Sequence, residues 1–232
     1  MTEEDAWREA ADSYCLRPGE SEALLDGHPW HRFAVVGDSV AEGVIEFTAG
    51  YRDVPWGDRI ADALRECQPG LAYLNLGTRN LRAAEVREKQ LGSALAFGPD
   101  LALVVCGGYD LFQARHHPDS IRRELSTIVS AIRERGSDVI TVGMFDVSYS
   151  PYVPERYRPL LRQRLRTLTG QTEAVAAEHG ALYVGLTAHP AAESPDLYSS
   201  DGRHGSARGH AIAAAECVRH LGAHLGRTFP AR

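Results

Sequence analysis

The chain has 232 residues, of which 31 are acidic and 25 are basic, giving a net charge of −6, with 44% hydrophobic and 24% charged residues. These values are typical of a globular protein with one substantial core, and they predict a single domain over residues 1–232. The negative balance excludes a general nucleic-acid binder, which normally has a basic domain. No apolar run approaches the ~20 residues that cross a bilayer, so no membrane association is predicted.

The four cysteines predict free thiols rather than a disulfide framework. They are widely spaced, they form no C-x-x-C pair, and the acidic residues 1–5 do not resemble the start of a signal peptide. Free thiols persist in a reducing compartment, so we expect a cytoplasmic location.

Residues 1–30 are predicted to be a helical extension, in which residues 2–16 form an amphipathic helix and residues 17–20 a loop. After this extension, short apolar runs alternate with longer helical patterns along the chain. The strands are predicted at 33–36, 71–76, 101–106, 139–142 and 181–184. The helices are predicted at 56–67, 82–96, 120–135, 155–178 and 206–225.

Continuous apolarity is typical of strands that are covered on both faces. The alternation of strands with helices therefore predicts an α/β fold, a three-layer α/β/α arrangement around a flavodoxin-like parallel sheet of about five strands. Ligands of such sheets bind at the carboxyl ends of the strands. The residues expected to border a site are thus 37–39, 77–80, 107–110, 146–149 and 201–204.

Three residues in these segments fit nucleophilic catalysis. Ser39 lies on a glycine-flanked turn between strand and helix, where a hydroxyl can be exposed beside the start of a helix. Asp201 and His204 stand close enough in sequence for the carboxylate to orient the imidazole, which would then take the serine proton. The alternative is that Ser39 is an ordinary helix cap, Asp201 caps a turn, and His204 is a surface residue.

The order of these motifs resembles the SGNH hydrolase family, also called GDSL esterases and lipases. Residues 37–43 (GDSVAEG) are similar to its first block, which carries the nucleophile, and residues 201–204 (DGRH) to its last block. Residues 74–80 and 105–110 fall where the second and third blocks belong. Two connecting segments also resemble actinobacterial members of the family, namely 54–59 and 97–101.

The resemblance implies a serine esterase that needs no cofactor and no metal. Ser39 would attack the carbonyl of a small or medium acyl ester to form an acyl-serine, His204 would take and return the proton, and Asp201 would orient the imidazole. The expected partner is a small-molecule acyl ester or an acylated natural product, and not a nucleic acid or a membrane.

Two positions depart from the family pattern. In the family, a glycine N–H of the second block and an asparagine amide of the third are aimed at the oxyanion, and these positions are Asn80 and Tyr109 here. Asn80 keeps its N–H, and the Tyr109 phenol is a donor with a longer reach. Asn80, Tyr109 and Gly108 are therefore the expected oxyanion and substrate-binding residues. Gly205 replaces the proline expected after the catalytic histidine, which would loosen that loop.

Several functions remain open on the sequence. The same Ser39 would serve an acyltransferase or a thioesterase-like enzyme of a biosynthetic pathway. A family member that has lost hydrolysis and binds a ligand is another alternative, motivated by Asn80 and Tyr109. Tyr109 could also perform acid–base chemistry on a substrate that is not an ester. No oligomeric state is predicted.

Three further features each have two interpretations. The arginine-rich segment 156–166 is either a solvated helix face or a docking site in which Arg162 and Arg166 receive an acidic or phosphorylated acyl carrier. The aromatic segment 145–152 either lines a substrate pocket or forms a packed lid. His220 and His224 are expected to be a surface pair rather than metal ligands.

Overall fold

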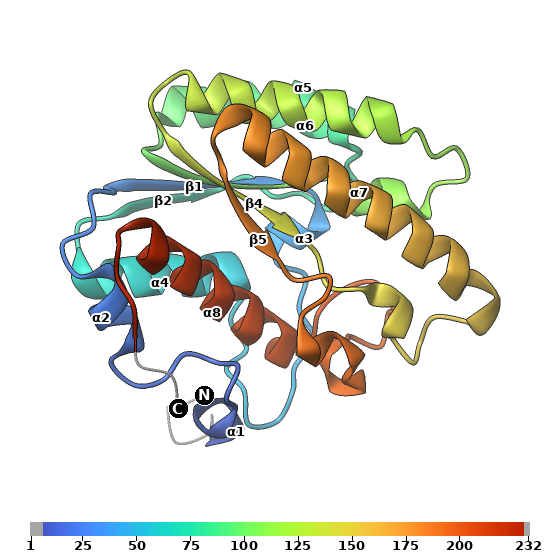
Figure 1. Ribbon diagram of the computed structural model, residues 1–232, viewed down its shortest axis with the longest axis horizontal. Coiled ribbons are helices and arrows are strands. Elements are labelled where there is room, and N and C mark those ends of the chain that lie inside the picture. Colours follow the sequence, from blue (N-terminus) through green and yellow to red (C-terminus); the bar gives the residue numbers. More distant parts are fainter. Residues whose placement is uncertain (1–6, 230–232) are drawn as a thin grey trace.

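Five parallel strands form the central sheet (Figure 1). The computed structural model describes residues 7–229, and its strands are β1 (Arg32–Gly37), β2 (Ala72–Asn75), β3 (Leu101–Val105), β4 (Asp138–Gly143) and β5 (Leu182–Gly185). Their order across the sheet is β2-β1-β3-β4-β5, and each neighbouring pair is parallel. This is the flavodoxin-like order, so the predicted fold class is confirmed.

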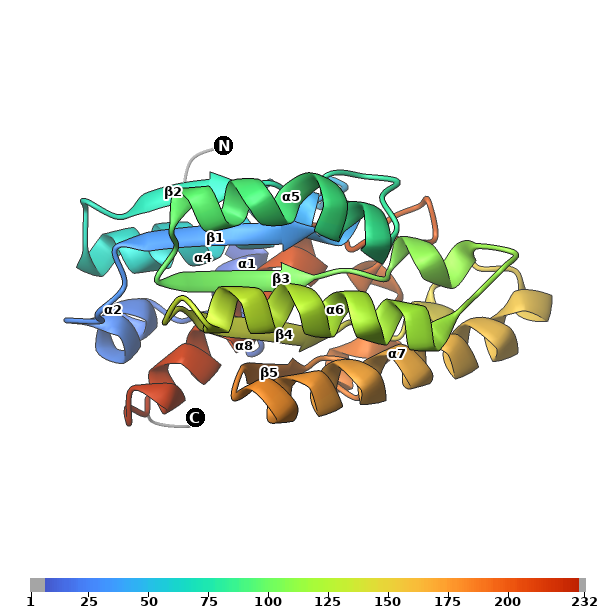
Figure 2. The same cartoon turned by 90° about the horizontal axis from the view of Figure 1, so that it is seen from above.

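Helices cover both faces of this sheet. On one face lie α2 (Glu20–Leu25), α4 (Trp56–Cys67) and α8 (Ala207–His224), below the sheet in Figure 1. On the other lie α5 (Ala83–Phe97), α6 (Pro118–Arg133) and α7 (Arg158–His179), which run side by side in Figure 2. Strand β3 shows why the sheet needs both layers, since Leu103 packs into one layer and Val104 into the other, and both are fully buried.

The N-terminal prediction is wrong in its helix boundaries. Residues 1–6 lie outside the described residues, and the helix that follows is α1 (Trp7–Ala11), which ends well before residue 16. It ends because the Asp12 carboxylate accepts a hydrogen bond from the Tyr14 N–H at 3.0 Å, which favours a turn. The other Asp12 oxygen accepts from Tyr51 and Arg208, both at 2.8 Å, so this turn is fixed by distant parts of the chain.

Helix α2 was not predicted. The loop predicted at 17–20 ends one residue early, at Gly19, whose φ of 75° precedes the helix. Glu20 is buried, and its carboxylate pairs with Arg219 of α8 at 2.7 Å, while Leu24 and Leu25 pack into the core beside α4 and α8. The helix is therefore stabilised by tertiary packing rather than by local propensity.

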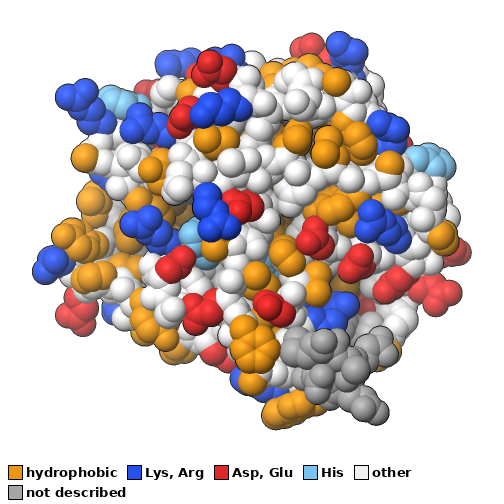
Figure 3. Space-filling model, turned by 180° about the vertical axis from the view of Figure 1, so that it is seen from behind, with side chains coloured by type: hydrophobic (Ala, Val, Ile, Leu, Met, Phe, Trp, Pro, Cys, Tyr) orange, Lys and Arg blue, Asp and Glu red, His pale blue; other side chains and the backbone are white. Residues whose placement is uncertain are grey.

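The four cysteines are free, as predicted. Within residues 7–229, no helix has both the length and the apolarity that crossing a membrane requires. Acidic and basic side chains are interspersed over the face shown in Figure 3.

Candidate active site

Ser39 stands at the carboxyl end of β1, as the first residue of α3 (Ser39–Glu42). The turn into α3 depends on Gly37, which has a φ of 153° and approaches β3 so closely that a Cβ there would lie 1.7 Å from the Val105 carbonyl oxygen. The Gln90 side chain donates to the Gly37 carbonyl and accepts from its N–H, both at 2.9 Å. The backbone before the serine is thereby held on both sides.

Asp38 joins the first and third blocks, a role that the sequence analysis did not assign. Its side chain is fully buried and accepts hydrogen bonds from the N–H groups of Val40 at 3.0 Å and Tyr109 at 3.1 Å. Burial raises the pKa of Asp38 to about 6, although these backbone N–H groups favour the carboxylate. The only signal in the sequence is a charged residue between an apolar strand and the serine.

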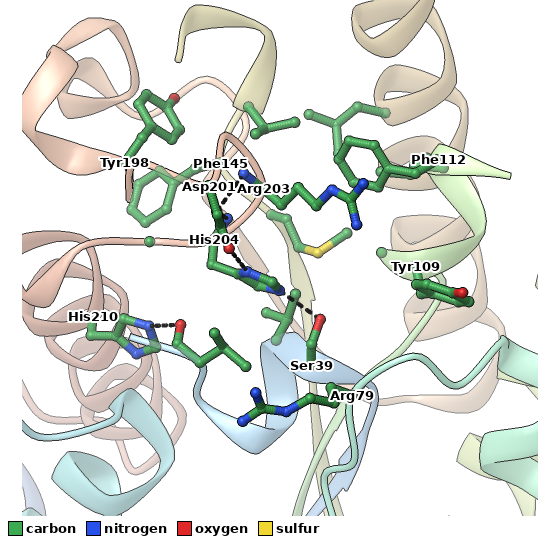
Figure 4. Close-up of a pocket in the computed structure, with 18 of the residues that line it drawn as sticks. Ser39, Arg79, Tyr109, Phe112, Phe145, Tyr198, Asp201, Arg203, His204 and His210 are labelled. Carbon is green, nitrogen blue, oxygen red and sulfur yellow. Dashed lines mark hydrogen bonds and ion pairs between the residues drawn. The ribbon is translucent and has the colours of Figure 1, made fainter. Parts of the chain in front are cut away.

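Ser39, His204 and Asp201 form a continuous chain of hydrogen bonds (Figure 4). His204 Nε2 lies 2.8 Å from the Ser39 Oγ, and His204 Nδ1 lies 2.5 Å from an Asp201 carboxylate oxygen. Because a carboxylate only accepts, Nδ1 carries the proton and Nε2 is left to accept from the serine hydroxyl. The structure thus brings together the three residues that the sequence analysis selected.

A backbone hydrogen bond within the loop joins its two ends around Asp201 and His204. The Ser199 N–H donates to the His204 carbonyl at 2.9 Å, and Gly202 has a φ of 69°. Gly205 forms an antiparallel bridge with Tyr198, so the glycine that replaces the expected proline is held in place.

Asp201 stays ionised because of its hydrogen bonds. One of its oxygens accepts from the Ser199 hydroxyl at 2.5 Å and from the N–H groups of Arg203 at 2.8 Å and His204 at 3.0 Å, in addition to the imidazole on the other oxygen. Burial by itself would raise the pKa of Asp201, but these donors lower it to about 2. Ser199 is a further residue of the site that the sequence analysis missed.

Two backbone N–H groups are available at the serine. Within the part of the chain that the structure describes, the N–H groups of Ser39 and Asn80 have no hydrogen-bond acceptor, and both residues line the same cavity. Asn80 has a φ of 64°, a conformation that asparagine adopts more readily than most residues. Next to it, Arg79 is bound to Glu42 of α3 through its backbone N–H at 2.6 Å and its Nε at 2.8 Å.

Tyr109 begins the short 3-10 helix η2 (Tyr109–Phe112) after β3. Its ring lies at the edge of the cavity, and Figure 4 shows its hydroxyl on the side away from Ser39. Among residues 7–229 this hydroxyl has no hydrogen-bond partner, so its part in an oxyanion hole stays a prediction. Gly108 also lines the cavity, where a Cβ would lie 3.3 Å from an Asp38 oxygen.

The cavity over Ser39 has a volume of about 230 Å³ and mostly apolar walls. These walls are contributed by the segments that follow β3 and β4 and by α7, and include Leu111, Phe112, Met144, Phe145, Val147 and Leu165. Only part of the aromatic segment 145–152 lines the cavity. Phe145 is in the cavity wall, whereas Tyr149 and Tyr152 are exposed outside it.

Arg162 of the arginine-rich segment has a local partner. Its Nε contacts the Ser148 hydroxyl at 3.0 Å and an Asp146 oxygen at 3.4 Å, and its guanidinium stacks on Tyr149. It ties α7 to the loop after β4, so it is not a free cation for an acyl carrier.

His210 of α8 is a buried neutral histidine behind the catalytic loop. Its Nδ1 accepts from the Trp56 N–H at 3.0 Å, and its Nε2 lies 3.1 Å from the Val44 carbonyl oxygen, to which it donates. Burial lowers the pKa of His210 to about 4 from an ordinary value of 6.5.

The His210→Gln substitution is expected to destabilise the protein more at pH 7 than at pH 4.5, by roughly 2 kcal/mol. An unfolded histidine binds its proton below pH 6.5, while the folded one stays neutral until about pH 4, so this side chain contributes stability that is lost as the pH falls between those values. The Asp38→Asn substitution is expected to destabilise the protein less at pH 7 than at pH 4.5, because the folded-state pKa of Asp38 is raised. The test is the free energy of unfolding in urea, measured for wild type and both variants at the two pH values. If a variant differs from wild type by the same amount at pH 7 and at pH 4.5, the prediction for that variant is wrong.

Comparison with known proteins identifies the family and the fold of the chain. The sequence model of the GDSL-like lipase/acylhydrolase family matches residues 35–212. No curated protein is similar enough in sequence to match the chain.

Solved structures share the fold at low identity. A lipase/acylhydrolase from Enterococcus faecalis is 20% identical with a TM-score of 0.65, over 84% of this chain and 96% of that one. An acetylxylan esterase from Geobacillus stearothermophilus is 18% identical with a TM-score of 0.64, over 86% and 96%. The family match extends from β1 into α8 and includes Ser39, Asp201 and His204, and the chain therefore belongs to the GDSL-like lipase/acylhydrolase family.

Proposed function

We propose that this protein is a serine esterase that hydrolyses small or medium acyl esters through an acyl-serine on Ser39. The observation that carries the proposal is the hydrogen-bonded chain from Ser39 through His204 to Asp201 at the floor of an apolar cavity. A serine is a weak nucleophile until a base takes its proton, and the 2.8 Å contact supplies that base.

The reaction proceeds in two halves. The Ser39 Oγ attacks the ester carbonyl while His204 Nε2 takes its proton, and the proton then passes to the departing alcohol. Water next attacks the acyl-serine with His204 again as base, and the acid leaves. The N–H groups of Ser39 and Asn80 stabilise the negative oxygen in both halves, because neither has another acceptor among the described residues.

The cavity favours a small substrate. Its volume of about 230 Å³ is below the range of roughly 300–1,000 Å³ typical of sites for drug-sized ligands. Its apolar walls fit an acyl chain or a ring.

Hydrolysis of p-nitrophenyl esters from acetate to decanoate tests the proposal. We expect turnover of the short and medium esters and a fall in kcat/KM toward decanoate. Intact-protein mass spectrometry during turnover should show the added mass of one acyl group. Added alcohols separate hydrolysis from transfer, since an acyltransferase would form transfer product faster than free acid. Absence of turnover with every ester would contradict the proposal.

Replacing Tyr109 by asparagine is expected to raise kcat for p-nitrophenyl butyrate by ~10-fold or more. Position 109 is held by its N–H on Asp38, the tyrosine hydroxyl has no partner there, and one oxyanion donor is typically worth ~10²- to 10³-fold in rate. Tyr109→Ala is the control, because it removes the ring without adding a donor. If both variants lose activity to the same extent, the tyrosine itself contributes to the reaction.

A further inference from the structure

Arg203 is a charged side chain of the cavity whose guanidinium has no acidic partner among residues 7–229. Its Cζ lies 5.1 Å from the centre of the Phe112 ring. Figure 4 shows the side chain extending from the catalytic loop to Phe112 on the opposite side of the cavity. A guanidinium that stacks on a ring keeps its N–H donors free at its edges.

The other charged side chains around the cavity already have hydrogen-bond partners. Arg79 is bound to the Glu42 carboxylate, and Asp201 accepts hydrogen bonds from the imidazole, a hydroxyl and two backbone N–H groups. Arg203 is thus a charged side chain of the cavity lining whose guanidinium has no side-chain hydrogen-bond partner among the described residues. Its side chain is exposed, its backbone N–H is bound to Asp201, and its head group contacts the Phe112 ring.

We propose that Arg203 binds an anionic group of the substrate, a carboxylate or a phosphate, beside the scissile ester. Arginine binds such groups through two parallel N–H donors, and Arg203 lines the cavity that contains Ser39. This inference rests on the proposed esterase activity and narrows its substrate class to acyl esters that carry a negative charge. Arg203 directly precedes His204 and lines the same cavity as Ser39.

Two matched pairs of esters test the inference and show which half of the substrate carries the charge. Mono-p-nitrophenyl glutarate and its methyl ester place the charge or its neutral equivalent on the acyl side. The 4-acetoxybenzoate anion and its methyl ester do the same on the alcohol side.

The measured quantity is the ratio of kcat/KM for the anionic and the neutral ester of each pair. The proteins are wild type, Arg203→Gln, Arg203→Lys and Arg156→Gln. Arg156 is the matched control, because it is also an exposed arginine over an aromatic ring, that of Tyr157 at 4.8 Å, but does not line the cavity.

We expect wild type to prefer the anionic ester of at least one pair by ~10-fold, the typical effect of a charge-assisted hydrogen-bonded pair. Arg203→Gln should bring that ratio to about 1 by lowering kcat/KM for the anionic ester more than for the neutral one, Arg203→Lys should be intermediate, and Arg156→Gln should match wild type. The preference should also shrink in 1 M salt.

Three outcomes would overturn the inference. One is the absence of a preference for either anion in a wild type that hydrolyses the neutral esters, which leaves the esterase proposal standing. Another is an equal loss with both members of a pair in Arg203→Gln, which would mean that the residue positions the His204 loop. A wild type inert to all four esters contradicts the proposed function, and this inference falls with it.

Discussion

The Ser39→Ala variant is expected to lose ester hydrolysis by at least ~10⁴-fold in kcat, with a folded structure and little change in KM. The substitution removes the hydroxyl that lies 2.8 Å from the catalytic imidazole, and within the described residues no other hydroxyl contacts His204. The fold should persist because α3 is capped by the Asp38 side chain through the Val40 N–H, not by Ser39. The measurement is the rate with p-nitrophenyl butyrate beside the unfolding free energy in urea.

The chain offers a matched control for this variant. Ser126 of α6 also forms a serine–histidine pair, with its Oγ 2.7 Å from His179 Nε2, but neither residue lines the cavity. Ser126→Ala should therefore keep kcat within about twofold, as expected for a substitution outside the reacting groups. Retention of a tenth or more of the wild-type rate by Ser39→Ala would show that another group is the nucleophile.

The sheet could be predicted from sequence because strands that are buried on both faces are continuous apolar runs. Strand β3 is a run of five fully apolar residues, and β1 and β4 are nearly so, which is the pattern that two covering helix layers require. Helix α4 was predicted with the bounds that it has, since it is strongly amphipathic and follows a proline. Glycines with positive φ at 98 and 180 mark the ends of α5 and α7.

The N-terminal segment could not be predicted because its structure depends on distant residues. Helix α1 ends where Asp12 meets Tyr51 and Arg208, and α2 is fixed by an ion pair between Glu20 and Arg219. None of these partners is visible in a local pattern, so propensity alone extends the first helix too far and misses the second.

In the site, too, the sequence predicts some features and not others: it predicts where the backbone places a residue, but not which hydrogen bonds the side chain makes. Ser39, Asp201 and His204 could be selected because strand ends and short motifs fix the course of the backbone around them. The contributions of Asp38 and Ser199 depend on side-chain geometry, since each becomes visible only through the hydrogen bonds it makes. The direction of the Tyr109 hydroxyl is likewise set by rotamer and packing, which a motif does not encode.

Replacing Asp201 by asparagine is expected to reduce kcat by ~10³- to 10⁴-fold while KM and the fold are retained. The reason lies in how the two carboxylate oxygens are used. One accepts from the Ser199 hydroxyl and from two backbone N–H groups, so the amide oxygen of an asparagine would occupy that side. The amide NH₂ would then face His204 Nδ1 and, having no lone pair to offer, would make that nitrogen the acceptor. The proton would move to Nε2, which could no longer accept from Ser39.

This result would separate orientation of the imidazole from simple loss of a charge. Ser199→Ala is the control, because it removes one donor to Asp201 and leaves the carboxylate on Nδ1, so kcat should fall only a few-fold. The NMR signal of the His204 Nδ1 proton should be present in Ser199→Ala and absent in Asp201→Asn. If Asp201→Asn kept both that proton and most of the activity, the carboxylate would not be what fixes the imidazole, and the base in this protein would be oriented by the backbone of the closed loop alone.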